Sequence, residues 1–147
     1  MTYEEKIAVL TETAKEDGID SEESRRIFAR LCNYATDFHE ASNVTPTRIL
    51  IQTLGYTKYR IRKELSFLKK LGLVERTTCG FPAYEIYTEN GLIDCDESHP
   101  PINGFGLTTK GFESATYKKA NKILDEEYRR LAEMTEEEIQ REMEQEG

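Results

Sequence analysis

Residues 45–78 read TPTRILIQTLGYTKYRIRKELSFLKKLGLVERTT. Thr45 is a residue type that caps helix N-termini, and Pro46 suits the first helical position because the N–H that proline lacks has no partner there. These two residues predict a short helix that runs to about Leu54. Gly55 comes directly after it, and glycine tolerates the left-handed backbone with which many helices end.

A second, longer helix is expected after this turn. Thr57 is its candidate N-cap, and Gly72 ends it after about Leu71. One face of this helix carries three aliphatic residues spaced four and three positions apart: Ile61, Leu65 and Leu68. The remaining positions are mostly cationic. Residues 73–78 follow and predict a strand.

Two helices joined by a short turn with glycine, then a strand, are the order of a helix-turn-helix unit. Residues 45–78 resemble the core of a winged helix-turn-helix DNA-binding domain, as found in many bacterial transcriptional regulators. In that family a leucine-rich recognition helix leads through Gly-Leu-Val, here residues 72–74, into a wing hairpin. Residues 107–111 resemble the segment where the wing closes into a final helix. The resemblance covers about residues 21–115.

The expected fold class is mainly α with a small antiparallel β-hairpin wing (α+β), a winged helix-turn-helix with extra N- and C-terminal helices. Residues 1–20 would form an N-terminal helix and residues 21–111 the winged helix-turn-helix domain. Residues 112–147 would form an acidic, helical dimerisation segment. The wing is enlarged over residues 78–105, because a simple wing needs only a few residues at its tip.

Weaker patterns place the remaining elements. Helices are expected over residues 2–16 and 21–38, a strand over 83–88, an irregular stretch over 94–104 and a return strand over 105–107. A two-residue hairpin turn is expected at Asn90 and Gly91. Thr108 or Thr109 would cap one long polar helix. The apolar or small residues of this helix lie near one face: Phe112, Thr116, Ala120, Ile123 and Leu131. Thr135 and Glu138 have capping-box spacing, so the acidic end is a separate helix or a frayed one.

The charge of the chain is strongly asymmetric. The net charge of all 147 residues is −8. Between Arg48 and Arg76, eight cationic and two acidic residues give a net charge of +6, which leaves −14 for the other 118 residues. A local cationic segment on an acidic protein is compatible with nucleic-acid binding, which the total charge alone would argue against.

The second helix of such a pair enters the major groove and presents its first turns to base edges. Residues at the start of the preceding helix are expected to face the DNA backbone, because helix N-termini favour anions. A cation on the first wing strand is a further phosphate contact. The candidate DNA-contacting residues are Thr45, Thr47, Arg48, Thr57, Lys58, Tyr59, Arg60, Arg62, Lys63, Ser66 and Arg76.

Two functions are compatible with these patterns. The first is a sequence-specific, double-stranded DNA-binding transcriptional regulator, prokaryotic or phage-like, that forms a homodimer through its C-terminal helix. The alternative is a protein-interaction winged helix without DNA binding, acting as an acidic adaptor, an inhibitor or a DNA mimic. The wing insert favours a protein partner at that place, because it has no lysine or arginine and would be repelled by phosphate. Its acidic residues are Glu85, Glu89, Asp94, Asp96 and Glu97.

Other function classes find little support. No nucleophile triad or phosphate-binding loop occurs, so no enzyme and no cofactor is expected. Cys79, Cys95 and His99 lack the paired spacing of structural zinc ligands, and no metal is expected. Three widely spaced cysteines predict free thiols in a reducing cytoplasm. No apolar stretch has the length of a membrane span.

Overall fold

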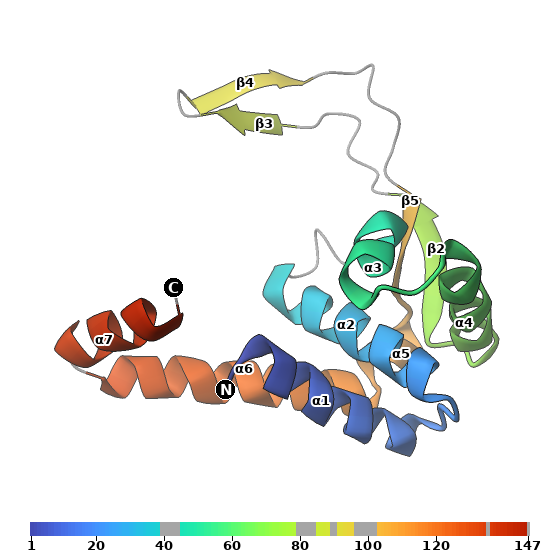
Figure 1. The fold of residues 1–147 in the computed structure, drawn as a ribbon, viewed down its shortest axis with the longest axis horizontal. Coiled ribbons are helices and arrows are strands. Elements are labelled where there is room, and N and C mark those ends of the chain that lie inside the picture. The colour runs from blue at the N-terminus through green and yellow to red at the C-terminus, as the bar shows by residue number, and fades with distance from the viewer. Residues whose placement is uncertain (39–44, 79–84, 89–90, 96–102, 135, 147) are drawn as a thin grey trace.

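The computed structural model describes residues 1–38, 45–78, 85–88, 91–95, 103–134 and 136–146 (Figure 1). Its helices are α1 (Tyr3–Thr13), the short 3-10 helix η1 (Ala14–Asp17), α2 (Glu22–Phe38), α3 (Thr47–Leu54), α4 (Lys58–Lys70), α5 (Thr109–Phe112), α6 (Ala115–Glu133) and α7 (Glu136–Glu146). Its strands are β1 (Thr45–Pro46), β2 (Val74–Thr78), β3 (Glu85–Thr88), β4 (Gly91–Cys95) and β5 (Asn103–Leu107).

The predicted fold class is confirmed: the protein is mainly helical, and an antiparallel β2–β5 wing follows the helix pair α3–α4.

Local signals set the boundaries of the helix pair. Gly55 and Gly72 follow α3 and α4 with φ of 70° and 79°, the left-handed region that glycine adopts without strain. Thr57 caps α4, because its hydroxyl accepts a hydrogen bond from the N–H of Arg60 at 3.1 Å. Both features agree with the sequence prediction.

The expected helix start at Thr45 and Pro46 is wrong. These two residues form the strand β1, which pairs with β5 through Thr45 with Phe105 and Pro46 with Gly104. The helix α3 begins one residue later, at Thr47. Pairing with a strand almost sixty residues further along the chain therefore overrides the local preference for a helix cap.

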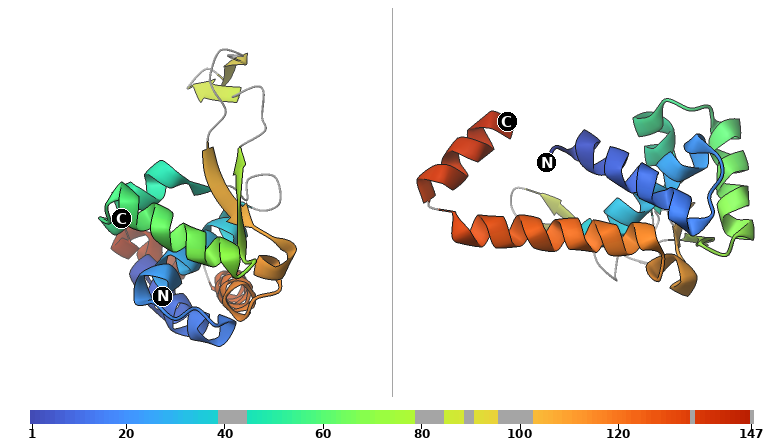
Figure 2. Two further views of the ribbon diagram at one scale, coloured as in Figure 1. Left: turned by 90° about the vertical axis from the view of Figure 1, so that its right-hand side faces the viewer. Right: turned by 90° about the horizontal axis from the view of Figure 1, so that it is seen from below.

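The three-stranded sheet has the order β1–β5–β2, and all its pairs are antiparallel. The return strand is longer than predicted, since it begins at Asn103. Strands β3 and β4 form a separate hairpin, which Figures 1 and 2 show beyond the end of the wing. Gly91, expected in the hairpin turn, instead belongs to β4 and pairs with Thr88, and Asn90 lies outside the described residues.

Three helices form the body on which the helix pair sits. The helix α2 contacts α1, α4 and α6, and Figure 2 shows α1 and α6 side by side. The side chains of Ile27, Phe28 and Leu31 on α2 are fully buried at the centre of this packing. No helix in the described ranges is long and apolar enough to cross a membrane.

The single long helix expected after residue 108 is broken in two. Thr108 caps the short α5, and Ser114 caps α6, where its hydroxyl accepts from the N–H of Tyr117 at 3.1 Å. Asp17 adds a second cap: its carboxylate accepts from the N–H groups of Ala115 at 2.8 Å and Thr116 at 3.0 Å. A carboxylate at a helix N-terminus also interacts favourably with the helix dipole. The acidic end forms a separate helix, α7.

The chain passes unusually close to itself where α5 meets the start of β2. A Cβ atom at Gly111 would lie 2.3 Å from the carbonyl oxygen of Leu73 and 3.1 Å from the Cβ of Leu107. In the same region the Thr108 hydroxyl donates to the carbonyl of Gly72. The backbone N–H of Thr108 donates to the carbonyl of Leu73 at 3.1 Å. Glycine at position 111 is thus required for α5 to close the wing.

We expect the substitution Gly111→Ala to lower the free energy of unfolding by about 1–3 kcal/mol, because the new methyl group would clash with backbone. Chemical denaturation followed by circular dichroism measures this loss. Thr109→Ala, in the same short helix but exposed, serves as the control. Equal stability of the two variants would contradict the close approach.

Candidate nucleic-acid interface

The helix α4 has a buried face and a cationic face. Ile61, Leu65 and Leu68 are fully buried, as their spacing predicted, and pack with the rest of the core. On the opposite side, six of the predicted contact residues are exposed: Lys58, Tyr59, Arg60, Arg62, Lys63 and Ser66. Tyr59 is the most exposed of the large hydrophobic residues in the described ranges, with 77% of its surface accessible. The first two turns of α4 therefore present cations and a phenol to solvent.

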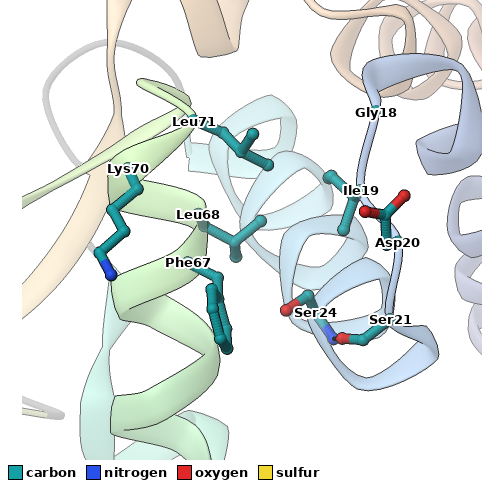
Figure 3. A pocket seen from close by; sticks show the side chains of 9 residues that line it. All are labelled: Gly18, Ile19, Asp20, Ser21, Ser24, Phe67, Leu68, Lys70 and Leu71. Atoms are coloured by element: carbon teal, nitrogen blue, oxygen red, sulfur yellow. Dashed lines mark hydrogen bonds between the residues drawn. The ribbon is translucent and has the colours of Figure 1, made fainter.

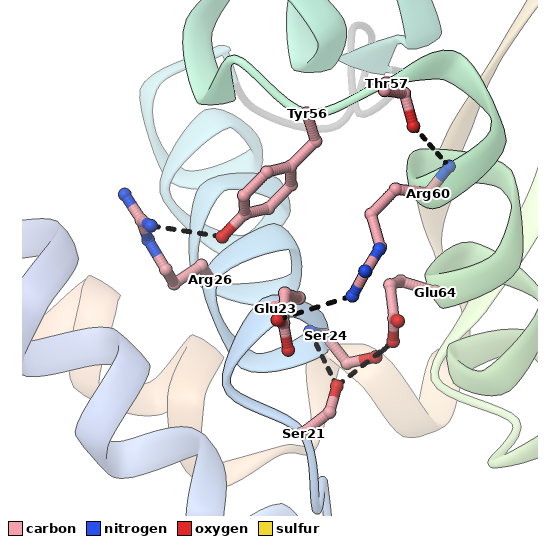
Figure 4. A network of polar contacts seen from close by, with 8 residues as sticks. All are labelled: Ser21, Glu23, Ser24, Arg26, Tyr56, Thr57, Arg60 and Glu64. Atoms are coloured by element: carbon pink, nitrogen blue, oxygen red, sulfur yellow. Dashed lines mark hydrogen bonds and ion pairs between the residues drawn. The ribbon is translucent and has the colours of Figure 1, made fainter.

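Arg60 differs from the other cations of this face. Its guanidinium lies 3.4 Å from a carboxylate oxygen of Glu23 on α2, and both side chains are well exposed, at 47% and 39% (Figure 4). An exposed pair of this kind contributes little to stability. In the described part of the chain no carboxylate pairs with Lys58, Arg62 or Lys63.

Ser66 and Thr57 already use their hydroxyl groups within α4. Ser66 donates to the carbonyl of Arg62 at 3.0 Å, and Thr57 accepts from the N–H of Arg60. Both remain exposed. Their first role is thus local, in the cap and in the third turn of the helix.

The other predicted contact residues lie in different environments. Thr45 is buried, with 2% of its surface exposed, so the expectation that it faces DNA is wrong: its side chain lies beneath the surface beside β5. Thr47 is half-buried at the start of α3. Arg76 is exposed on β2. Arg48 lies in α3, and its side chain falls outside the described part of the structure.

A buried polar network fixes α4 on the start of α2. Glu64 lies on the inner face of α4, and its Oε2 accepts from the hydroxyl groups of Ser21 at 3.0 Å and Ser24 at 2.5 Å (Figure 4). Ser21 also accepts from the N–H of Ser24 at 3.0 Å and so caps α2. In the sequence, Glu64 stands out only as one of the two acidic residues among the cations of residues 48–76. Its position, three residues after Ile61 and directly before Leu65, is the signal that could have placed it inside.

A second contact holds the turn between the two helices. The phenol of Tyr56 accepts from the Arg26 guanidinium at 3.0 Å, and the guanidinium carbon lies 5.7 Å from the ring centre (Figure 4). The turn is therefore attached to α2 through Tyr56, and α4 is attached to it through Glu64. Such attachment keeps the cationic face in one orientation.

A groove of about 270 Å³ runs between the last turns of α4 and the turn before α2 (Figure 3). Phe67 and Leu68 line it from α4, Leu71 lines it from directly after α4, and Ile19 faces them. The ammonium of Lys70 lies 5.8 Å from the ring centre of Phe67. This apolar surface is distinct from the cationic first turns of the helix.

The described residues provide no cluster of three or more ligands that could hold a metal ion. Cys32 is a free, fully buried thiol, and burial raises its pKa well above the usual range, so that it stays protonated. Cys79, Asp96 and His99 lie outside the described residues, as do the side chains of Asp94 and Cys95. The acidic wing insert proposed as a protein contact belongs to the same undescribed set of side chains.

No protein-family model matches the sequence, and no curated protein sequence matches it. Among solved structures, the chain is similar to a glycine-to-lysine mutant of MepR from S. aureus. The sequence identity is 16% and the TM-score is 0.40, and the match covers 99% of this chain and 93% of that chain. Since the sequence identity and the TM-score are low, the fold assignment rests on the element order and the sheet topology.

We expect Glu64→Ala to lower the free energy of unfolding by about 1–3 kcal/mol, because the buried hydroxyl of Ser24 would lose its acceptor. Thermal or urea denaturation measures the change. Glu75→Ala removes an exposed carboxylate from β2 and is the matched control. If both variants lost the same small amount, Glu64 would have no part in fixing α4.

Proposed function

We propose that the protein is a non-catalytic, sequence-specific regulator that binds double-stranded DNA with α4 in the major groove. The observation that carries the proposal is the exposed first half of α4, where Lys58, Arg62 and Lys63 have no carboxylate partner in the described structure. An α-helix with its side chains is about 10–12 Å wide, which suits the major groove of about 12 Å.

Each exposed group has a defined chemistry toward DNA. Arg62 and Lys63 would donate hydrogen bonds to guanine O6 and N7 or to phosphate oxygens. Tyr59 would pack on a thymine methyl group or donate to a phosphate. Thr47 and Arg76 would contact the DNA backbone and hold the register of the protein.

The protein-interaction alternative draws on the acidic remainder of the chain. Such a module would use the acidic surface, and its cations would then serve only solubility or internal ion pairs. The one ion pair of a cation on α4 in the described structure, between Arg60 and Glu23, is long and exposed. Since Lys58, Arg62 and Lys63 pair with no carboxylate among the described side chains, DNA binding is the better-supported function.

We further propose a homodimer formed through the C-terminal helices. The end of α6 and the helix α7 project from the body (Figures 1 and 2). Their exposed apolar side chains are Tyr128, Leu131 and Met143. An ion pair of 2.6 Å between Arg130 and Glu142 holds α7 against α6 and so supports one combined surface. A dimer would present two copies of α4 to two half-sites.

The double substitution Arg62→Ala with Lys63→Ala is expected to weaken binding to selected DNA at least tenfold, because it removes two donors to DNA. Gel shift with fragments selected from a random pool measures this. Lys118→Ala with Lys122→Ala changes the net charge equally on exposed positions of α6 and is the control. The affinity of the unmodified protein should also fall steeply with salt.

DNA binding that is unchanged in the double variant would refute the assignment of α4. No retained DNA at low or moderate salt, together with a stable complex with a basic protein, would favour the interaction module instead.

Tyr128→Glu with Leu131→Glu is expected to convert a dimer to a monomer, because charges would be buried at the centre of the contact. Sedimentation equilibrium measures the mass, and Glu133→Gln on the same helix is the control. A monomeric unmodified protein, or an unchanged dimer in the variant, would contradict this interface.

A further inference from the structure

A second cavity, of about 200 Å³, lies where α1, α2, β1 and α3 meet. Its walls include Tyr3 from α1, Arg30 and Asn33 from α2, Thr45 from β1, and Ile49 and Leu50 from α3. One part of the wall is therefore aliphatic and another is polar. A cavity of about 150 Å³ is large enough to hold benzene, so this one has the size for a single-ring molecule.

Unpartnered polar atoms are concentrated at this cavity. Across the described residues, four buried side-chain atoms have no hydrogen-bond partner: Arg25 Nε, Arg30 Nε, Asn33 Oδ1 and Thr45 Oγ1. Three of the four belong to residues that line the cavity. Asn33 and Thr45 are only 3% and 2% exposed. Native structures satisfy most buried polar groups, so three unsatisfied groups around one space indicate a missing polar partner.

The charge of the cavity wall is positive. Arg30 donates from one terminal nitrogen to the Tyr3 hydroxyl at 3.0 Å, and its guanidinium carbon lies 5.4 Å from the centre of that ring. No carboxylate pairs with Arg30 in the described ranges. Among the described residues, the cavity thus offers a cation without a counter-charge next to an unpartnered hydroxyl and an unpartnered amide oxygen.

The groove beside α4 lacks these features. Its two buried or half-buried serines, Ser21 and Ser24, already donate to Glu64, and none of its lining residues carries an unpartnered buried atom. The buried polar groups of the groove are therefore satisfied, whereas three of those at the cavity are not.

We propose that the cavity at Arg30, Asn33 and Thr45 binds a small organic carboxylate with an apolar body. The carboxylate accepts hydrogen bonds from the Arg30 guanidinium and the Thr45 hydroxyl. The Asn33 amide donates to it after a flip of its terminal group, since the oxygen and nitrogen ends of an amide have nearly the same shape. Ile49 and Leu50 contact the apolar body. Carboxylate and guanidinium form the stronger, charge-assisted kind of hydrogen bond.

A carboxylate that binds the terminal nitrogen of Arg30 displaces the Tyr3 side chain, because the Tyr3 hydroxyl accepts the hydrogen bond of that nitrogen. Tyr3 is the first residue of α1 and is half exposed. Its displacement exchanges a phenol for a carboxylate as the acceptor of the Arg30 hydrogen bond.

Cyclohexanecarboxylate tests the proposal, with cyclohexanemethanol as the neutral molecule of similar shape. On the full chain without DNA, the carboxylate at about 10 mM is expected to raise Tm by about 3 °C, as a ligand with a Kd of about 1 mM would. The alcohol should raise Tm much less. Calorimetric titration with each compound gives the two affinities directly.

Variants locate the site. Arg30→Gln should weaken carboxylate binding at least tenfold. Arg26→Gln is its matched control, because Arg26 lies one turn earlier on α2 and also donates to a tyrosine hydroxyl, that of Tyr56, but does not line the cavity. Thr45→Val keeps the side-chain volume and removes the unpartnered hydroxyl. It should weaken binding several-fold while leaving the ligand-free Tm unchanged or higher.

Three results would overturn the proposal. These are a carboxylate that does not bind the unmodified protein, an alcohol that binds equally well, and an equal loss of affinity in Arg30→Gln and Arg26→Gln. The first result would mean that water alone fills the cavity. Because every arm is measured without DNA, such a failure leaves the DNA-binding proposal to its own test.

Discussion

The packing of α4 against α2 is the interaction on which the rest of the structure depends. Ile61, Leu65 and Leu68 bury one side of α4 in the core, and helical periodicity then turns the cationic positions outward. Glu64 adds direction to this packing, because its carboxylate is bound by Ser21 and Ser24 at the start of α2. Apolar contact alone permits small rotations of a helix, whereas hydrogen bonds of fixed geometry restrict them.

The electrostatic layout follows from the same arrangement. The cations of α4 lie near one end of the long axis, and the acidic helix α7 lies near the other (Figure 1). An anionic polymer that approaches this protein would be attracted at one end and repelled at the other, so the charge orients the encounter before any contact forms. The exposed pair of Arg60 and Glu23 is weak enough for a phosphate to replace the carboxylate. The acidic total charge and a nucleic-acid partner are therefore compatible.

Several elements could be predicted from local signals. The Thr57 cap, the glycines at 55 and 72 and the spacing of the aliphatic residues each depend on a few neighbouring positions, and all were placed correctly. Thr45 and Pro46 were misplaced because β5, their pairing partner, is far away in the sequence. The break before α6 was missed for the same reason, since Asp17 helps to cap it from the other end of the chain. Arg62 and Lys63 were predicted to be exposed, but the burial of Glu64, the next residue, was missed although its spacing from Ile61 could have indicated it.

Amino-acid order alone determined the helix pair, the direction of its buried face and the concentration of positive charge, because capping, glycine conformation and helical spacing act over a few residues. Only the tertiary structure decided which hydroxyl groups donate hydrogen bonds to Glu64 and why a methyl group cannot fit at Gly111. It also decided where Arg30, Asn33 and Thr45 come together around a cavity. Each of these depends on segments that are distant in sequence and meet only when the core closes. Their geometry is set by packing, to which no short sequence pattern corresponds.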